Sequence, residues 1–212
     1  PQEQRPQRLT EYWEAIEQGT RGLQAEVDER GLHRYACDLW ETYCGIFVYT
    51  NAAFARAFVS AAACARLADR HQLAEEWQHV AGRLKEACKN LYNGAYFPRG
   101  FRESGALDDA VDTSSLGLVE PWCVLSPHDP QERHMILTNL HEIESRLRQA
   151  LPAQYPPPYL TRGVAALNAS SAPGSADVPT ASEMIGLRRF EGDAYLGGVV
   201  GCVNTLWAAQ IY

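Results

Sequence analysis

Two consecutive stretches between residues 51 and 91 repeat apolar side chains at the spacing of an α-helix. The first, residues 51–69, is rich in alanine and apolar on most sides, which is typical of a helix buried on all faces. The second, residues 73–91, has one apolar stripe and charged residues elsewhere, so it predicts an amphipathic helix at the periphery. A buried helix followed by an amphipathic one indicates inner and outer layers of helices.

The same spacing predicts helices at residues 9–29, 111–122, 129–147 and 194–212. The segment Asp129-Pro130-Gln131-Glu132 has the form of a capping box with proline at the first helical position. We expect loops between the helices at residues 32–47 and 92–109, and the second of these stretches leaves room for a short hairpin. Residues 1–8 are expected to be a flexible end, and residues 152–182, rich in Pro, Ser and Ala, a long loop.

These elements predict an all-α protein in one domain that covers residues 1–212. Buried and amphipathic helices partly alternate, which favours concentric layers of helices in an α/α toroid. The helices number about half of what such a toroid needs. A plain helical bundle or a helical repeat array would give a similar pattern, although no fixed sequence period is visible.

Composition excludes several classes of partner. The formal charge is −7, with 19 basic residues scattered among 26 acidic ones, so no nucleic-acid partner is expected. No apolar run approaches the ~18 residues of a membrane span, so no membrane partner is expected either. The cysteines are too few and scattered for a disulfide scaffold, and we expect reduced thiols in a cytoplasmic protein: Cys37, Cys44, Cys64, Cys88, Cys123 and Cys202. The chain begins at Pro1 rather than Met, so secretion stays open.

Residues 38–43 combine two carboxylates with two large aromatic rings. Saccharide sites need this mixture, because aromatic faces stack on sugar rings and carboxylates accept hydroxyl hydrogen bonds or exchange protons. Glu41 lies beside Trp40, and an apolar wall raises the pKa of a carboxyl, so Glu41 is the better candidate for a general acid. Asp38 is better suited to anchor sugar hydroxyls or the loop itself. By its composition alone, such a loop is more often a structural element.

Three segments, in order, resemble those of one enzyme family. They are Asp38-Leu39-Trp40-Glu41, residues 111–119, and residues 186–198 with the sequence GLRRFEGDAYLGG, followed by Thr205-Leu206-Trp207. These segments are similar to the acid-bearing, inner-helix and late sugar-facing segments of glycoside hydrolase family 15, the glucoamylase family. The resemblance covers most of the chain and implies the C-terminal part of an (α/α)6 toroid, with inverting exo-hydrolysis of an α-glucan or α-glucoside and release of glucose.

The resemblance also implies residue roles. Glu41 would be the general acid, and the substrate-binding residues would be Asp38, Trp40, Arg189, Asp193 and Tyr195. The chain departs from the family pattern at Val199-Val200-Gly201, where Asn-Pro-Trp is usual, and at Thr42, where many members have a second Glu. The family's general base falls beyond the last matching segment, so it is not in this chain. The alternative is a non-catalytic carbohydrate-binding or regulatory helical domain.

Three other groups could carry chemistry, and each has a simpler explanation. Glu183 or Glu191 could replace the missing base, but a loop carboxylate beside Arg188 or Arg189 is more typical of an ion pair. An acidic cluster that could bind Ca²⁺ is better explained by the helix dipole: Asp108, Asp109 and Asp112. A soft-metal set without zinc spacing is better explained by packing: His33, Cys37 and Cys44. We therefore predict neither a metal nor a cofactor.

Overall fold

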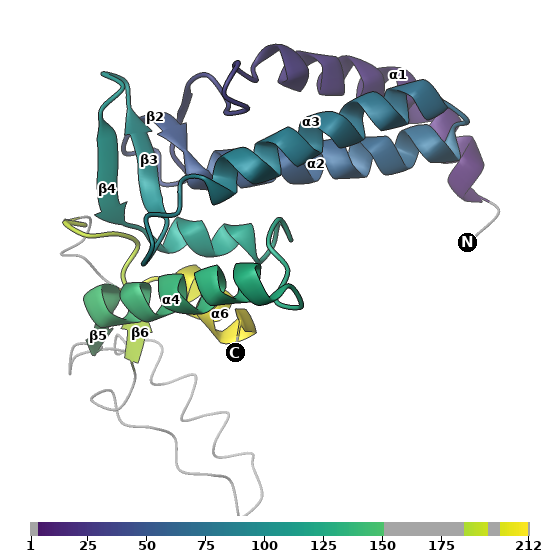
Figure 1. The fold of residues 1–212 in the computed structure, drawn as a ribbon. Coiled ribbons are helices and arrows are strands. Elements are labelled where there is room, and N and C mark those ends of the chain that lie inside the picture. The colour runs from purple at the N-terminus through teal and green to yellow at the C-terminus, as the bar shows by residue number, and fades with distance from the viewer. Residues whose placement is uncertain (1–3, 151–184, 195–199, 212) are drawn as a thin grey trace, which may run out of the picture.

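The computed structural model describes residues 4–150, 185–194 and 200–211, and in this part of the chain helices and a β-sheet share the architecture (Figure 1). The helices are α1 (Gln4–Ala25), α2 (Val48–Leu67), α3 (His71–Lys89), α4 (Pro130–Leu147) and α6 (Cys202–Ile211), with a short 3₁₀ helix, η1 (Thr113–Leu118). Helices α1, α2 and α3 run alongside one another, and α4 lies beyond them with α6.

Four strands form one antiparallel sheet in the order β1 (Ala36–Cys37), β2 (Cys44–Phe47), β3 (Pro98–Arg102) and β4 (Leu107–Val111). A second, two-stranded antiparallel sheet pairs β5 (Arg148–Ala150) with β6 (Ile185–Leu187). The larger sheet stands at one end of the helical layer (Figure 1). It positions the loop between β1 and β2, which carries the acidic aromatic residues.

The predicted all-α (α/α)6 toroid is therefore wrong, because the chain folds as a mixed α/β structure. The two segments expected to be loops, residues 32–47 and 92–109, supply most of the four-stranded sheet, and the short hairpin for which the second segment left room is the β3–β4 pair. The buried helix expected at residues 111–122 is a six-residue 3₁₀ helix that directly follows β4. These strands are short, and the paired residues of β2 and β3 are more than fifty positions apart in the sequence. No local periodicity therefore predicts the strands.

Glycines allow the central strands of the sheet to approach each other closely. A Cβ atom on Gly100 would overlap the carbonyl oxygen of Ile46, and one on Gly45 would overlap that of Phe101. Gly100 also has a φ of 151°, a backbone conformation that L side chains rarely adopt. The pairing of β2 with β3 therefore depends on glycine at both positions.

The helices expected from residues 51–69, 73–91 and 129–147 are confirmed as α2, α3 and α4. Helix α1 corresponds to the helix expected at residues 9–29, but it begins at Gln4, within the end expected to be flexible. The Asp129 side chain accepts a hydrogen bond from the Glu132 amide at 2.8 Å, which confirms the N-cap. Glu132 does not close the box; its carboxylate accepts from the Ser126 amide at 2.8 Å instead.

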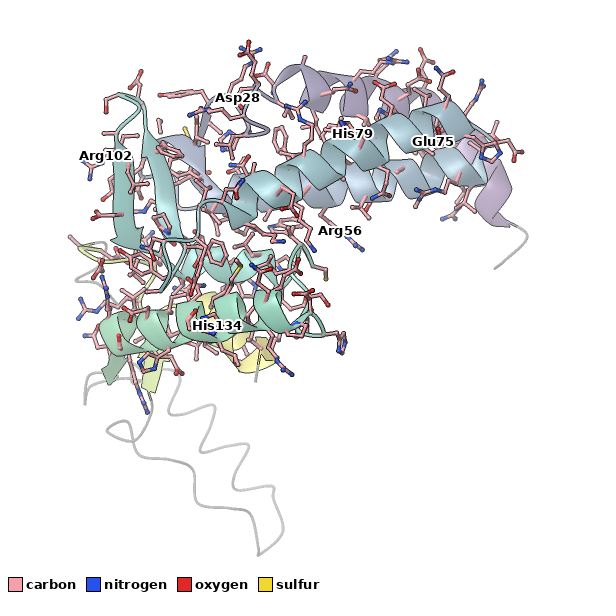
Figure 2. The ribbon with its side chains drawn as sticks, in the orientation of Figure 1. Asp28, Arg56, Glu75, His79, Arg102 and His134 are labelled. Atoms are coloured by element: carbon pink, nitrogen blue, oxygen red, sulfur yellow. The ribbon has the colours of Figure 1, made fainter. Side chains whose placement is uncertain are left out.

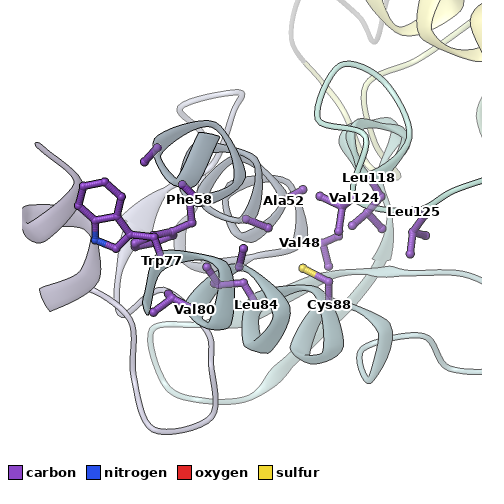
Figure 3. Close-up of a cluster of buried hydrophobic side chains, with 14 of the residues drawn as sticks. Val48, Ala52, Phe58, Trp77, Val80, Leu84, Cys88, Leu118, Val124 and Leu125 are labelled. Atoms are coloured by element: carbon purple, nitrogen blue, oxygen red, sulfur yellow. The ribbon is translucent and has the colours of Figure 1, made fainter. Parts of the chain in front are cut away.

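The main core lies between α2 and α3 and continues to η1 and the loop after it (Figure 3). Phe58 of α2 and Trp77 and Leu84 of α3 are completely buried in it. Exposed Glu75 and His79 lie on the polar side of α3 (Figure 2), as the amphipathic pattern of this helix predicts. Within the described ranges, no helix is both long and apolar enough to cross a membrane.

Candidate functional site

The candidate acid loop, residues 38–43, is the turn of the β1–β2 hairpin. Asp38 is buried, and its Oδ1 accepts hydrogen bonds from the backbone amides of Thr42 at 2.7 Å and Tyr43 at 3.0 Å. Glu41 is exposed and has a φ of 55°, in the left-handed region. Asp38 thus shapes the turn that presents Glu41, which is the loop-anchoring role that its sequence position allowed.

The Trp40 indole is hydrogen-bonded to the buried carboxylate of Asp112. The indole N–H donates to Asp112 Oδ1 at 3.0 Å, and the same oxygen accepts from the Ser114 amide at 2.8 Å, so Asp112 also caps η1. The guanidinium of Arg99 donates from Nε to Asp112 Oδ2 at 2.9 Å. The orientation of the indole therefore depends on a charged pair that is almost fully withdrawn from water.

Arg99 is the centre of this buried cluster. Its guanidinium lies over the rings of both Tyr43 and Phe190, with centroids at 4.2 and 4.5 Å, and also contacts Asp108 Oδ2 at 3.2 Å. Burial lowers the pKa of Arg99, but the charges of Asp112 and Asp108 outweigh burial and leave that pKa raised. Burial raises the pKa of Asp112, and the Arg99 charge acts in the opposite direction.

Residues 189–194 bring Arg189 and Asp193 next to the candidate acid loop. Their side chains form a bidentate ion pair, with Arg189 Nε at 2.8 Å and Nη2 at 2.6 Å from the two carboxylate oxygens. The Arg189 guanidinium lies 5.7 Å from the centroid of the Trp40 ring. Thr113 fixes this segment, because its amide and hydroxyl both donate to the Arg189 carbonyl, at 2.9 and 2.8 Å.

These two segments together line an open pocket of about 670 Å³. Its lining residues are Trp40, Glu41, Thr42, Tyr43, Arg189, Phe190, Gly192, Asp193 and Ala194. Trp40, Glu41, Arg189 and Asp193 of the expected site therefore share one pocket, whereas buried Asp38 does not line it. Tyr195 lies outside the described residues. The pocket offers an aromatic face, a guanidinium held in a fixed plane and an exposed carboxylate.

Sequence reasoning missed the roles of Arg99, Tyr43 and Phe190. No sequence signal identifies Arg99, because its partners lie on β4, just after β4, in the β1–β2 turn and in a segment ninety residues away. The acids near residue 110 were expected to favour a helix start, and Asp112 does cap η1, but Asp108 and Asp112 also pair with Arg99. Across the described residues, no group of three or more His, Cys, Asp or Glu side chains could hold a metal ion.

The carboxylate considered as a replacement base has other contacts. Glu191 accepts a hydrogen bond from the Val111 amide at 3.0 Å and lies 3.5 Å from Arg146, rather than pairing with Arg188 or Arg189. Glu183 lies outside the described residues. In the soft-metal set, Nε2 of His33 accepts a hydrogen bond from the Phe47 amide at 2.8 Å, so this nitrogen is engaged by the backbone.

Comparisons with known proteins identify no relative of this chain. No protein-family model matches the chain, and neither a curated protein nor a solved structure matches it significantly. The resemblance to the glucoamylase family therefore rests on the three sequence segments alone.

Proposed function

We propose that the chain binds an α-glucosidic saccharide in the pocket between residues 40–43 and 189–194, and that Glu41 is the general acid of a glycosidase. The observation that carries the proposal is the meeting of Trp40 and Glu41 with the Arg189–Asp193 pair in one open pocket. These groups come from segments about 150 residues apart, and they are the same groups that the glucoamylase-like segments nominate.

The chemistry of each group suits a sugar. The half-buried ring of Trp40 offers a flat apolar face for a pyranose, and its orientation is fixed by Asp112. Arg189 is held in a plane by Asp193, so its guanidinium is preorganised toward hydroxyl oxygens. Exposed Glu41 would donate its proton to the glycosidic oxygen once a bound sugar had excluded water from it.

Inverting hydrolysis needs a second carboxylate about 6.5–9.5 Å from the acid to activate water. Among the described pocket residues the only other carboxylate is Asp193, which is buried and paired with Arg189. The base of the proposed reaction therefore lies outside the described pocket. The same observation favours the second candidate, a non-catalytic carbohydrate-binding or regulatory domain.

Binding is tested first, by titrating maltose, isomaltose and trehalose while following tryptophan fluorescence. We expect saturable binding that Trp40→Phe abolishes and that Arg189→Lys weakens on the order of tenfold, because lysine cannot form the bidentate pair with Asp193 that fixes the plane of the guanidinium. Glu75→Gln, on the exposed face of α3, is the matched control and should bind normally. Absence of saturable binding by all three sugars would refute both candidate functions.

Hydrolysis is tested on the full gene product, with the anomeric form of released glucose recorded by NMR. Glu41→Gln should lower the rate on the order of 10²–10⁴-fold while leaving binding nearly unchanged. Glu75→Gln should have no effect. Binding without hydrolysis would select the non-catalytic candidate, and near-wild-type hydrolysis by Glu41→Gln would remove Glu41 from the acid role.

A further inference from the structure

Two thiols face each other across the β1–β2 hairpin, directly before and after the turn that forms the candidate loop. Cys37 of β1 and Cys44 of β2 are register partners, and their sulfur atoms lie 3.3 Å apart. Both side chains are exposed, and both cysteines are free. The loop between them, residues 38–43, contains Trp40 and Glu41.

The position in the ladder suits a disulfide. The Asp38 amide donates to the Tyr43 carbonyl at 2.9 Å, so the alternation of an antiparallel ladder makes the adjacent pair, Cys37 and Cys44, a non-hydrogen-bonded pair. The Cα atoms of such pairs are about 4.5 Å apart, within the ~4.4–6.8 Å that disulfides span. A bond length of about 2.05 Å is then within reach of side-chain rotation.

The other cysteines are less suited to this chemistry. Cys88 is fully buried, so an external disulfide cannot reach it, and burial raises the pKa of its thiol to about 12. The hydrogen bond with the Cys44 thiol also raises the pKa of Cys37, but Cys37 is exposed and has a second thiol beside it. Cys64 of α2 is half-buried. Cys123 and Cys202 are exposed, but neither has a register partner in the described sheets. Among the six cysteines, the hairpin pair is therefore the one best placed to close an intramolecular bond.

We propose that Cys37 and Cys44 form a reversible disulfide by exchange with an oxidised low-molecular-weight disulfide of the glutathione class. One cysteine thiolate attacks the external disulfide, forms a mixed disulfide and releases one external thiolate. The second cysteine thiolate then attacks the protein sulfur of that mixed disulfide and displaces the other external thiolate. The protein loses two electrons and two protons, and the external disulfide becomes two thiols.

The consequence for the hairpin is a closed ring. Oxidation joins residues 37 and 44 covalently and restrains the intervening turn, including Trp40 and Glu41, in the conformation that β1 and β2 already hold. Cross-links act by removing open conformations of the loop they close. The proposal does not depend on the proposed function, since it concerns only the two thiols and the mobility of the loop between them.

The test equilibrates the full chain with reduced and oxidised glutathione at graded ratios, followed by acid quenching, alkylation and peptide mapping. The wild type should lose two of its six alkylatable thiols in one step, with Cys37 and Cys44 recovered in one linked peptide. Cys37→Ser and Cys44→Ser should each carry a glutathione adduct on the remaining cysteine and no internal link. Cys123→Ser, also at an exposed cysteine, should behave as the wild type except for the lost thiol.

Hydrogen exchange separates bond formation from its effect on the loop. In the oxidised protein, the amides of residues 38–43 should exchange more slowly, on the order of tenfold, with no change in α4. Retention of all six thiols at the most oxidising ratio, or a link between other cysteines, would overturn the disulfide. A disulfide that leaves exchange in the loop unchanged would overturn the restraint on Trp40 and Glu41.

Discussion

The indole N–H of Trp40 donates a hydrogen bond to the carboxylate of Asp112, 72 residues further along the chain, at 3.0 Å. Asp112 is 1% exposed and also caps η1 and pairs with Arg99. The exposed pocket is therefore built on a buried charge cluster, and the stability of the fold is coupled to the orientation of the indole.

Removing the charge of Asp112 should be costly. In Asp112→Asn, the buried Arg99 guanidinium keeps only Asp108 as a charged partner, so we expect the free energy of unfolding to fall by about 3 kcal/mol, the lower end of the cost of breaking a buried ion pair. The measurement is urea unfolding followed by circular dichroism. Asp109→Asn, at an exposed neighbour, should change it by less than about 0.5 kcal/mol. Equal losses in the two variants would contradict the role of the buried pair.

His33 should make the fold sensitive to acid. Its side chain is 1% exposed, and burial lowers its pKa from 6.5 to about 4. Its Nε2 accepts the Phe47 amide, so protonation there breaks a buried hydrogen bond. The unfolded chain takes up this proton first as pH falls, so stability is fully present above pH 6.5 and is lost as pH falls toward 4, by about 3 kcal/mol in total.

The His33 contribution is isolated by comparing urea unfolding at several pH values between 7.5 and 4 for two variants. His33→Gln retains an oxygen that can accept the amide and does not titrate, so its stability should fall less steeply with acid than that of the wild type. His79→Gln, on the exposed face of α3, should keep the wild-type dependence. Parallel curves for His33→Gln and the wild type would rule out this coupling.

The close approach of β2 and β3 predicts the effect of a single methyl group. Gly100→Ala places a Cβ atom against the Ile46 carbonyl at a φ of 151° and should cost more than the ~1–3 kcal/mol of backbone strain alone. Gly94→Ala provides the control, because Gly94 also has a positive φ, 100°, but open space around it. Thermal unfolding of both variants should give the larger loss for Gly100→Ala, and the reverse order would contradict the observed pairing.

The core between α2 and α3 should be most sensitive at Trp77. This side chain is completely buried, so Trp77→Ala leaves a cavity and should lower the free energy of unfolding by about 3–5 kcal/mol. Leu67→Ala removes an apolar side chain that is 78% exposed at the end of α2 and should have little effect. Chemical denaturation at neutral pH measures both, and a small loss for Trp77→Ala would show that the α2–α3 interface differs from the one described.

Much of the helical structure was readable from the sequence. The apolar spacing of residues 51–69 and 73–91 predicted α2 and α3, and Asp129 with Pro130 predicted the start of α4. Only the β3–β4 hairpin, for which residues 92–109 left room, was foreseen; the rest of the sheet was not readable, because strands of two to five residues carry too little pattern to be distinguished from loops. Missing the sheet led to the wrong all-α fold class.

The sequence by itself determined the long helices α2, α3 and α4, the cap at Asp129, and the nomination of Trp40, Glu41, Arg189 and Asp193 through three family-like segments. Only the tertiary structure decided that these four share a pocket, that the buried Arg99–Asp112 pair orients the Trp40 indole, and that Cys37 faces Cys44. The physical reason is the range of the interactions. Helical hydrogen bonds join residues four apart and leave a local period, whereas strand pairing and buried ion pairs join distant residues and leave none.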